Sequence, residues 1–145
     1  IGSEKIIKKL NIWSDNFNNF FIYKSFGSAD LHGLFNLKNT TNKKVIFLGN
    51  SSSGLKETIY FNCPNLSYGK RQTERLSGFN TTLIDNNSQQ IIKAIYRVLK
   101  NYNKNIYSHK IENPYYFGNV SSKIENKVKS IDFDSVRLNK IFVKL

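Results

Sequence analysis

A run of small polar residues near the middle of the chain could bind an anion. The apolar residues 45–48 are followed by a glycine, Asn50, three serines and Gly54. This order predicts a buried strand that ends in a turn and continues into a helix. Free backbone N–H groups at a helix start, together with serine hydroxyls, bind phosphate groups. We therefore expect Ser51 and Ser52 to contact a phosphate or diphosphate, with Asn50 in the same site. The alternative is that a serine only caps the helix.

Two charged side chains after this turn could complete such a site. Glu57 is expected one or two turns into the helix, and Arg71 lies in a later Gly-Lys-Arg-Gln segment. A carboxylate can accept hydrogen bonds from both hydroxyls of a diol, and a guanidinium can bind phosphate oxygens or stack on a base. The alternatives are that Glu57 only complements the helix dipole and that Arg71 is a solvated surface residue.

These motifs resemble the hydrolysing UDP-N-acetylglucosamine 2-epimerases of sialic-acid-type sugar pathways. The similarity covers residues 1 to about 124, in the order expected for that family. The matching residues are Lys24-Ser25-Phe26-Gly27, Gly49 to Gly54 with Glu57, Pro64, Gly69-Lys70-Arg71-Gln72 with Arg75, Asn113-Pro114-Tyr115, Gly118-Asn119 and Ser122-Lys123-Ile124. Non-hydrolysing bacterial 2-epimerases share the fold but have an Asp-Ser-Gly-Gly type of loop. The serines after Asn50 therefore favour the hydrolysing branch.

The resemblance also implies how UDP would bind. In this family the carboxylate that matches Glu57 binds the ribose hydroxyls, the turn at Phe26 meets the uracil through its backbone, and Arg71 matches a nucleotide-binding arginine. The expected UDP-binding residues are Phe26, Asn50, Ser51, Ser52, Glu57 and Arg71. No cofactor and no metal site are expected, because His32 and His109 have no neighbours in the sequence that suggest a catalytic or metal site.

Two segments depart from the family pattern. Arg75 follows Glu74, where the family usually has a glycine, so an acid would lie next to the phosphate site. In the segment from Tyr115 to Gly118, the bulky Tyr116 and Phe117 replace a glycine and an acid of the family. The second change leaves open whether specificity is altered or activity is lost.

The elements that would position these residues alternate between strand and helix. We expect helices at residues 3–10, 28–37, 55–61 and 121–128, and an amphipathic segment at 135–144. Strands are expected at 20–26, 45–48 and 81–84, the short segment 64–67 could be another, and residues 38–44 would form a polar surface loop. After a turn or helix cap at 85–88, a further helix has a core stripe made of Ile91, Ile92, Ile95, Val98 and Leu99. This alternation predicts an α/β fold with a parallel sheet flanked by helices, Rossmann-like by resemblance.

By resemblance, the chain corresponds to the C-terminal half of a two-domain fold of the glycosyltransferase-B type. Residues 1–145 would form a single, partial UDP-binding domain without its first strand, and the N-terminal domain would be absent from this chain. The chain starts at Ile1 and has no methionine, which we interpret as part of a longer protein. The acid and base carboxylates of the family lie in the first domain, so no catalytic residue is expected here. The full-length protein would be the enzyme, and the isolated chain would be inactive.

Two other interpretations of the sequence stay open. A formal net charge of +12 would suit a basic nucleic-acid-binding module, but the lysines are scattered along the chain and form no single stripe. A UDP-binding remnant without activity is the other alternative, because the first domain is missing and the Tyr116-Phe117 loop is altered.

The remaining expectations concern the cell compartment and the partners. Cys63 is the only cysteine, so no internal disulfide can form, and its apolar context predicts a buried thiol. No apolar run is long enough to span a membrane and no signal peptide is visible, so we expect a cytoplasmic protein. The expected partners are a UDP-sugar substrate and the missing N-terminal domain. Association into a homo-oligomer is left open.

Overall fold

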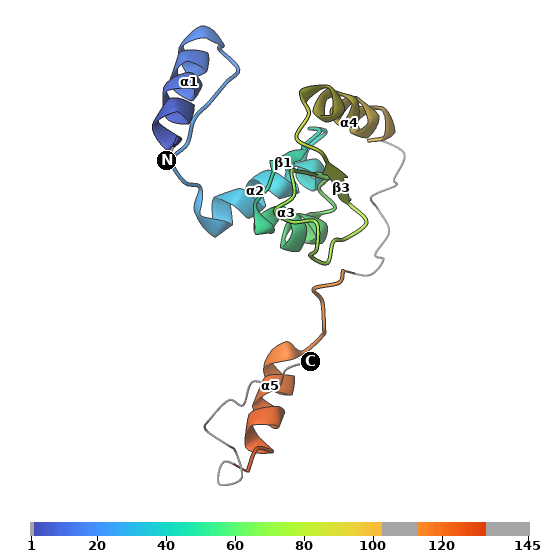
Figure 1. Ribbon diagram of the computed structural model, residues 1–145. Helices are drawn as coiled ribbons and strands as arrows, with labels where there is room; N and C mark the ends of the chain where they lie inside the picture. Colours follow the sequence, from blue (N-terminus) through green and yellow to red (C-terminus); the bar gives the residue numbers. More distant parts are fainter. Residues whose placement is uncertain (1, 103–112, 133–145) are drawn as a thin grey trace, which may run out of the picture.

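The computed structural model describes residues 2–102 and 113–132 (Figure 1). Helices and strands alternate through its middle part, which confirms the predicted α/β class. The expected amphipathic segment at 135–144 lies outside the described residues. The elements are α1 (Ser3–Asn16), α2 (Gly27–Thr40), β1 (Phe47–Gly49), α3 (Ser52–Lys56), the 3-10 helix η1 (Thr58–Phe61), β2 (Asn65–Tyr68), β3 (Thr81–Ile84), α4 (Ser88–Asn101) and α5 (Val120–Lys129).

Three parallel strands form the sheet in the described part of the chain, in the order β1-β2-β3. Asn65 in the middle strand lies opposite Phe47 on one side and opposite Thr81 on the other. Parallel neighbours require a crossover connection, and α3 and η1 supply it between β1 and β2. Because the strands run in the same direction, the loops that follow β1 and β2 lie at the same edge of the sheet. The serine loop and the segment with Arg71 are these two loops.

Helices cover both faces of the sheet (Figure 1). On one face, α4 packs against β2 and β3 through a core made of Leu66, Ile84, Ala94, Val98 and Tyr102. On the other face, α2, α3 and η1 pack together, and the rings of Phe35 and Phe47 meet edge to face with 5.6 Å between their centres. The sheet therefore separates two small apolar cores.

The predicted start of α4 is confirmed, and its predicted core stripe is confirmed in part. The side chain of Asn87 caps the helix, because it accepts hydrogen bonds from the backbone N–H groups of Gln89 and Gln90. Val98 is buried, whereas Ile92 is 53% exposed and does not belong to the core. Ala94 takes the central position instead, because it lies on the face of the helix that points to the sheet.

The strand expected at residues 20–26 is wrong. These residues pair with no strand in the described part of the chain, and Phe21 is 72% exposed. Aromatic and β-branched residues favour strands because they fit the surface of a sheet, but they do not by themselves provide a pairing partner. The segment instead connects α1 to α2 and has no regular structure.

Three helix boundaries also differ from the prediction. The first helix runs on to Asn16, and α2 continues to Thr40, so the polar loop is shorter than expected. The helix predicted at 55–61 begins earlier, at Ser52, and is divided into α3 and η1. Neither α1 nor α5 has a buried residue, and both lie away from the sheet (Figure 1).

Candidate functional site

A cavity of about 290 Å³ lies between the start of α2 and the helix α3. Phe26 and Glu57, two of the expected UDP-binding residues, are among the residues that line it. Gly27 has a φ of 67°, in the left-handed region that favours glycine, and lies at the junction between the lining residues Ser25 and Phe26 and the helix α2. The lining residues are Ser25, Phe26, Gly27, Ser28, Leu31, Ser53 and Glu57.

Glu57 lies directly after the last residue of α3 and forms a pair with His32 of α2. Its Oε2 atom is 2.8 Å from Nε2 of His32, and both side chains are partly exposed. Glu57 lies between one and two turns after Ser52, as expected, but at the junction of α3 and η1 and not inside a continuous helix. His32 is a further site residue that was not predicted from the sequence, since the two partners are 25 positions apart.

The serine loop lies beside the cavity. Ser51 caps α3, and its Oγ atom accepts a hydrogen bond from the N–H of Ser53 at 3.3 Å. Ser53 lines the cavity, whereas Asn50, Ser51 and Ser52 are not among the lining residues. The backbone of the loop is fixed by Gln72, whose Nε2 atom donates to the carbonyl oxygen of Asn50 at 2.8 Å. The structure thus places the expected anion-binding residues next to the wall that Ser53 and Glu57 form.

Gly54 lies in α3 and packs against the sheet. A Cβ atom at this position would lie 2.7 Å from Oδ1 of Asn65 and 2.7 Å from a ring carbon of Phe47. The glycine thus lets α3 approach β1 and β2 closely, and this packing sets the position of Ser52 and Ser53 relative to the sheet.

Arg71 lies in the loop after β2 and is exposed. It makes no hydrogen bond or ion pair with the residues that the structure describes, and it does not line the cavity. Its neighbour Gln72 is buried and bonded to Asn50, so Arg71 stands at the edge of the serine loop.

The segment Asn113-Pro114-Tyr115 contacts the loop after β2. The hydroxyl of Tyr115 donates to the carbonyl oxygen of Leu76, and Nζ of Lys56 lies 5.9 Å from the centre of the Tyr115 ring. Two matching segments that are distant in the sequence therefore meet close to α3. Tyr116 and Phe117, which follow, are exposed.

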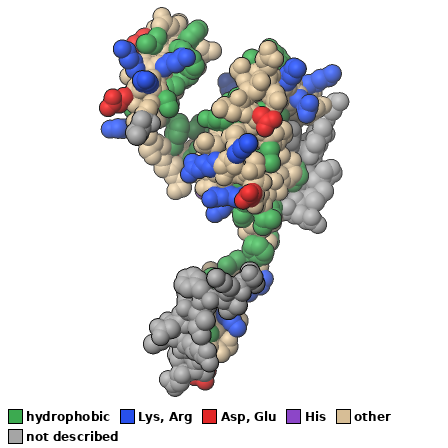
Figure 2. Space-filling model, viewed as in Figure 1, with side chains coloured by type: hydrophobic (Ala, Val, Ile, Leu, Met, Phe, Trp, Pro, Cys, Tyr) green, Lys and Arg blue, Asp and Glu red, His purple; other side chains and the backbone are tan. Residues whose placement is uncertain are grey.

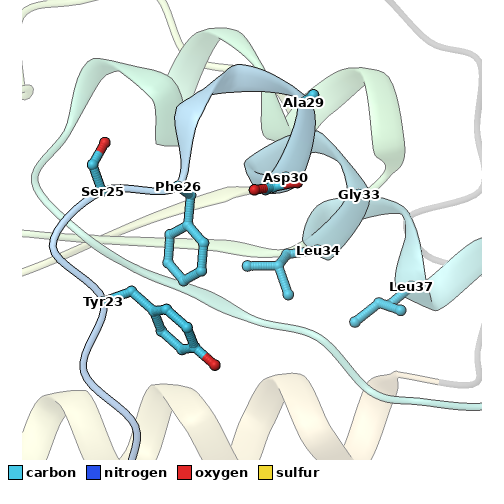
Figure 3. Close-up of a pocket in the computed structure, with 8 residues that line it drawn as sticks. All are labelled: Tyr23, Ser25, Phe26, Ala29, Asp30, Gly33, Leu34 and Leu37. Carbon is cyan, nitrogen blue, oxygen red and sulfur yellow. The ribbon is translucent and has the colours of Figure 1, made fainter.

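A second cavity of about 410 Å³ adjoins the first and shares Ser25 and Phe26 with it. Figure 3 shows the rings of Tyr23 and Phe26 side by side, on the opposite side of the chain from the Ser25 side chain. The centres of the two rings are 4.9 Å apart. The Phe26 ring therefore belongs to this second cavity, and its backbone lies at the border between the two.

Residues 2–102 and 113–132 contain neither a metal-binding cluster nor a membrane-spanning helix. No group of three or more His, Cys, Asp or Glu side chains is placed to bind a metal ion there. None of the helices described is both long and apolar enough to cross a membrane. His109 lies outside the described residues.

The chain was also compared with known proteins. A sequence profile described as UDP-N-acetylglucosamine 2-epimerase matches residues 2–129, which include both walls of the cavity. The chain belongs to the UDP-N-acetylglucosamine 2-epimerase family. No individual curated protein matches it. Membership of this epimerase family, together with the parallel sheet between helices, confirms the predicted Rossmann-like fold. Membership of this family supports a UDP-N-acetylglucosamine 2-epimerase-like function with a UDP-sugar as substrate.

Proposed function

We propose that this chain is the UDP-binding part of a hydrolysing UDP-N-acetylglucosamine 2-epimerase. The observation that supports this most is the family match, which spans the cavity between α2 and α3 and the serine loop beside it. The hydrolysing branch is supported by the three serines after Asn50, in place of the Asp-Ser-Gly-Gly loop of the non-hydrolysing enzymes. The products would be UDP and N-acetylmannosamine.

In the proposed reaction, anti-elimination removes the proton from C2 of the sugar and breaks the bond between C1 and the UDP oxygen, so that a 2-acetamidoglucal with a C1–C2 double bond forms and UDP leaves. Water then adds to this intermediate. The part of the chain described here would bind the leaving UDP. Glu57 would accept from the ribose hydroxyls, and the backbone at Phe26 would meet the uracil. Ser51, Ser52 and the exposed Arg71 would bind the diphosphate, whose negative charge increases as the bond breaks.

The proposal includes a second domain and a compartment. The chain would be the C-terminal half of a two-domain protein, with the substrate in the cleft between the domains and the acid and base carboxylates on the other wall. The protein would act in the cytoplasm.

A UDP-binding remnant without activity is a second candidate. It is supported by Tyr116 and Phe117, which are 68% and 63% exposed and replace a glycine and an acid of the family. Two large exposed rings would restrict a loop that closes over the sugar. Such a protein would still bind UDP, because Phe26, Ser53 and Glu57 would be unaffected.

Calorimetry with UDP, uridine and single-stranded RNA tests the binding proposal. We expect UDP to bind at least about tenfold more tightly than uridine, because charge-assisted hydrogen bonds to the diphosphate are lost with uridine. The Glu57→Ala variant should bind UDP more weakly by about 1–3 kcal/mol with its circular dichroism spectrum unchanged. Glu125→Ala is the matched control, because Glu125 is an exposed acid of α5. Equal affinity for UDP and uridine would exclude a diphosphate site, and a preference for RNA would favour the basic module.

The reaction itself is tested on a protein that joins this chain to an N-terminal domain of the family. Product analysis by nuclear magnetic resonance should show free UDP and N-acetylmannosamine. Formation of UDP-N-acetylmannosamine would place the protein in the non-hydrolysing branch. Binding of UDP without any turnover would favour the remnant.

A further inference from the structure

His32 and Glu57 connect the two walls of the candidate site. His32 belongs to α2, Glu57 follows α3, and the Nε2–Oε2 distance is 2.8 Å. A carboxylate oxygen accepts hydrogen bonds, so the Nε2–H group of His32 is the donor. The carboxylate is therefore held from the side of α2 while the backbone of Glu57 is held by α3, through its N–H bond to the carbonyl oxygen of Ser53 at 2.9 Å.

The His32 ring is itself fixed by aromatic neighbours. Its centre lies 5.2 Å from that of Phe61 and 6.4 Å from that of Phe35. Phe35 is buried in the core between α2 and the sheet. Contacts with these two rings therefore restrict the direction in which the partly exposed His32 donates its hydrogen bond.

The bond to His32 leaves most of the Glu57 carboxylate able to accept. A carboxylate has about four lone-pair positions, and His32 uses one of them. The other oxygen, Oε1, has no hydrogen-bond partner among the residues that the structure describes. Since Glu57 lines the cavity together with Ser53, a ligand in the cavity can approach its carboxylate.

From these contacts we infer that His32 is the positioning residue for Glu57 and makes nucleotide binding depend on the ribose hydroxyls. By fixing one oxygen, it holds the carboxylate in the orientation in which it accepts from a vicinal diol. The ligand class is a ribonucleotide, as opposed to a deoxyribonucleotide. This inference rests on the proposed binding of UDP and adds the residue that determines sugar selectivity.

The test compares the affinity of the chain for UDP and for 2′-deoxy-UDP by calorimetry. The unmodified chain should prefer UDP by about tenfold, the usual effect of one charge-assisted hydrogen bond. His32→Leu has a similar volume but no donor, so its preference should fall to about twofold or less, mainly through weaker binding of UDP. His32→Gln keeps an N–H donor and should restore a preference within about threefold of the original. His32→Asn has a donor that is too short to reach Glu57 and should behave like His32→Leu, which provides a second variant if the Leu variant does not fold.

The outcomes separate this inference from the proposed function. If the unmodified chain does not bind UDP, both are wrong. If it binds UDP with the tenfold preference and folded His32→Leu or His32→Asn keeps that preference, His32 has no positioning role and the proposed function stands. A folded variant that binds both nucleotides more weakly by the same factor would show that His32 only joins α2 to α3, which also overturns the inference.

Discussion

The side-chain amide of Gln72 donates a hydrogen bond to the backbone carbonyl of Asn50 over 2.8 Å, which joins the loop after β2 to the serine loop after β1. Gln72 is 1% exposed, whereas the adjacent Arg71 is exposed. Two neighbouring residues of one sequence segment thus have different roles. One fixes the serine loop from inside, and the other is available to a ligand at the surface.

Replacing Gln72 by Leu should lower the free energy of unfolding by about 1–2 kcal/mol. The apolar side chain would fill a similar space but leave the carbonyl of Asn50 without its partner. Urea unfolding followed by circular dichroism measures this change. Glu74→Ala, at a nearby exposed position, is the control and should stay within about 0.5 kcal/mol of the unmodified chain. An equal, small effect in both variants would show that the Gln72 bond does not stabilise the loop.

Replacing Arg71 by Ala should weaken UDP binding by about 1–3 kcal/mol and leave the stability unchanged. Arg71 has no hydrogen bond or ion pair with the described residues, so its removal breaks no contact there, but a guanidinium at this edge would bind the diphosphate. Calorimetry gives the affinity. Arg97→Ala on α4 is the matched control, because it removes the same charge from an exposed position outside the cavity between α2 and α3. If both variants weaken binding equally, the effect of Arg71 is only that of net charge.

Replacing Gly54 by Ala should destabilise the fold by about 1–3 kcal/mol. The added methyl group would lie 2.7 Å from Oδ1 of Asn65, so α3 would have to move away from the sheet. Thermal unfolding measures the effect, and UDP affinity should fall as well, because the serine loop moves with α3. Gly33→Ala is the control, because a Cβ atom there meets nothing within 4 Å. Equal melting temperatures of the two variants would contradict this packing role.

Features of the fold that depend on neighbouring residues could be predicted from the sequence. The strand at 81–84 was predicted with its observed bounds, because β-branched residues lie between two polar turns. The Asn87 cap and the burial of Val98 follow from the same local rules. The prediction of a strand at 20–26 was wrong because strand formation also needs a partner strand, which no local pattern specifies.

The candidate site likewise contains residues that a local sequence pattern indicates and residues that only the packing of distant segments brings together. Asn50, Ser51, Ser52 and Glu57 were predicted as binding residues because they lie close together in the sequence and resemble a family motif. Ser53, which lines the cavity, was not among them. The bond from His32 to Glu57 joins two helices and depends on how α2 packs on η1, so the sequence contained no signal for it. Likewise, only the packed structure shows that Gln72, and not Arg71, fixes the serine loop.

The thiol of Cys63 should react slowly with disulfide reagents. Burial raises its pKa to about 11, more than the nearby charge of Lys38 lowers it. The folded pKa is higher than the unfolded value, so the protonated thiol stabilises the fold below about pH 9, and this contribution is lost as the pH rises through about 11. At pH 8 the thiolate fraction, and hence the rate, should be about a hundredfold lower than for an exposed cysteine. Absorbance after mixing with an aromatic disulfide measures this rate, and denaturation in urea should abolish the protection. A fast reaction in the folded state would show that Cys63 is accessible.

The isolated chain should have no epimerase or hydrolase activity but should bind UDP. Removal of UDP from the sugar needs an acid and a base at the sugar carbons, and the resemblance places these carboxylates in another domain. Within the described residues, the acid–base pair at the cavity is His32 with Glu57, and we assign this pair to the ribose. Loss of one positioned acid or base alone typically lowers a rate by about 10²–10⁴-fold. Binding groups from one domain only cannot supply the difference between ground-state and transition-state binding that catalysis needs.

The measurement is UDP release from UDP-N-acetylglucosamine by the purified chain, followed with a coupled nucleotide assay. We expect a rate equal to that of the buffer, both for the unmodified chain and for the Ser52→Ala variant. Calorimetry on the same samples must show that the unmodified chain binds UDP, so that the absence of turnover is not a result of misfolding. Turnover above background that disappears in Ser52→Ala would show that the chain has its own catalytic groups. The assignment of His32 and Glu57 to the ribose alone would then be wrong, since this pair would be the acid and base nearest to the bound sugar nucleotide in the described structure.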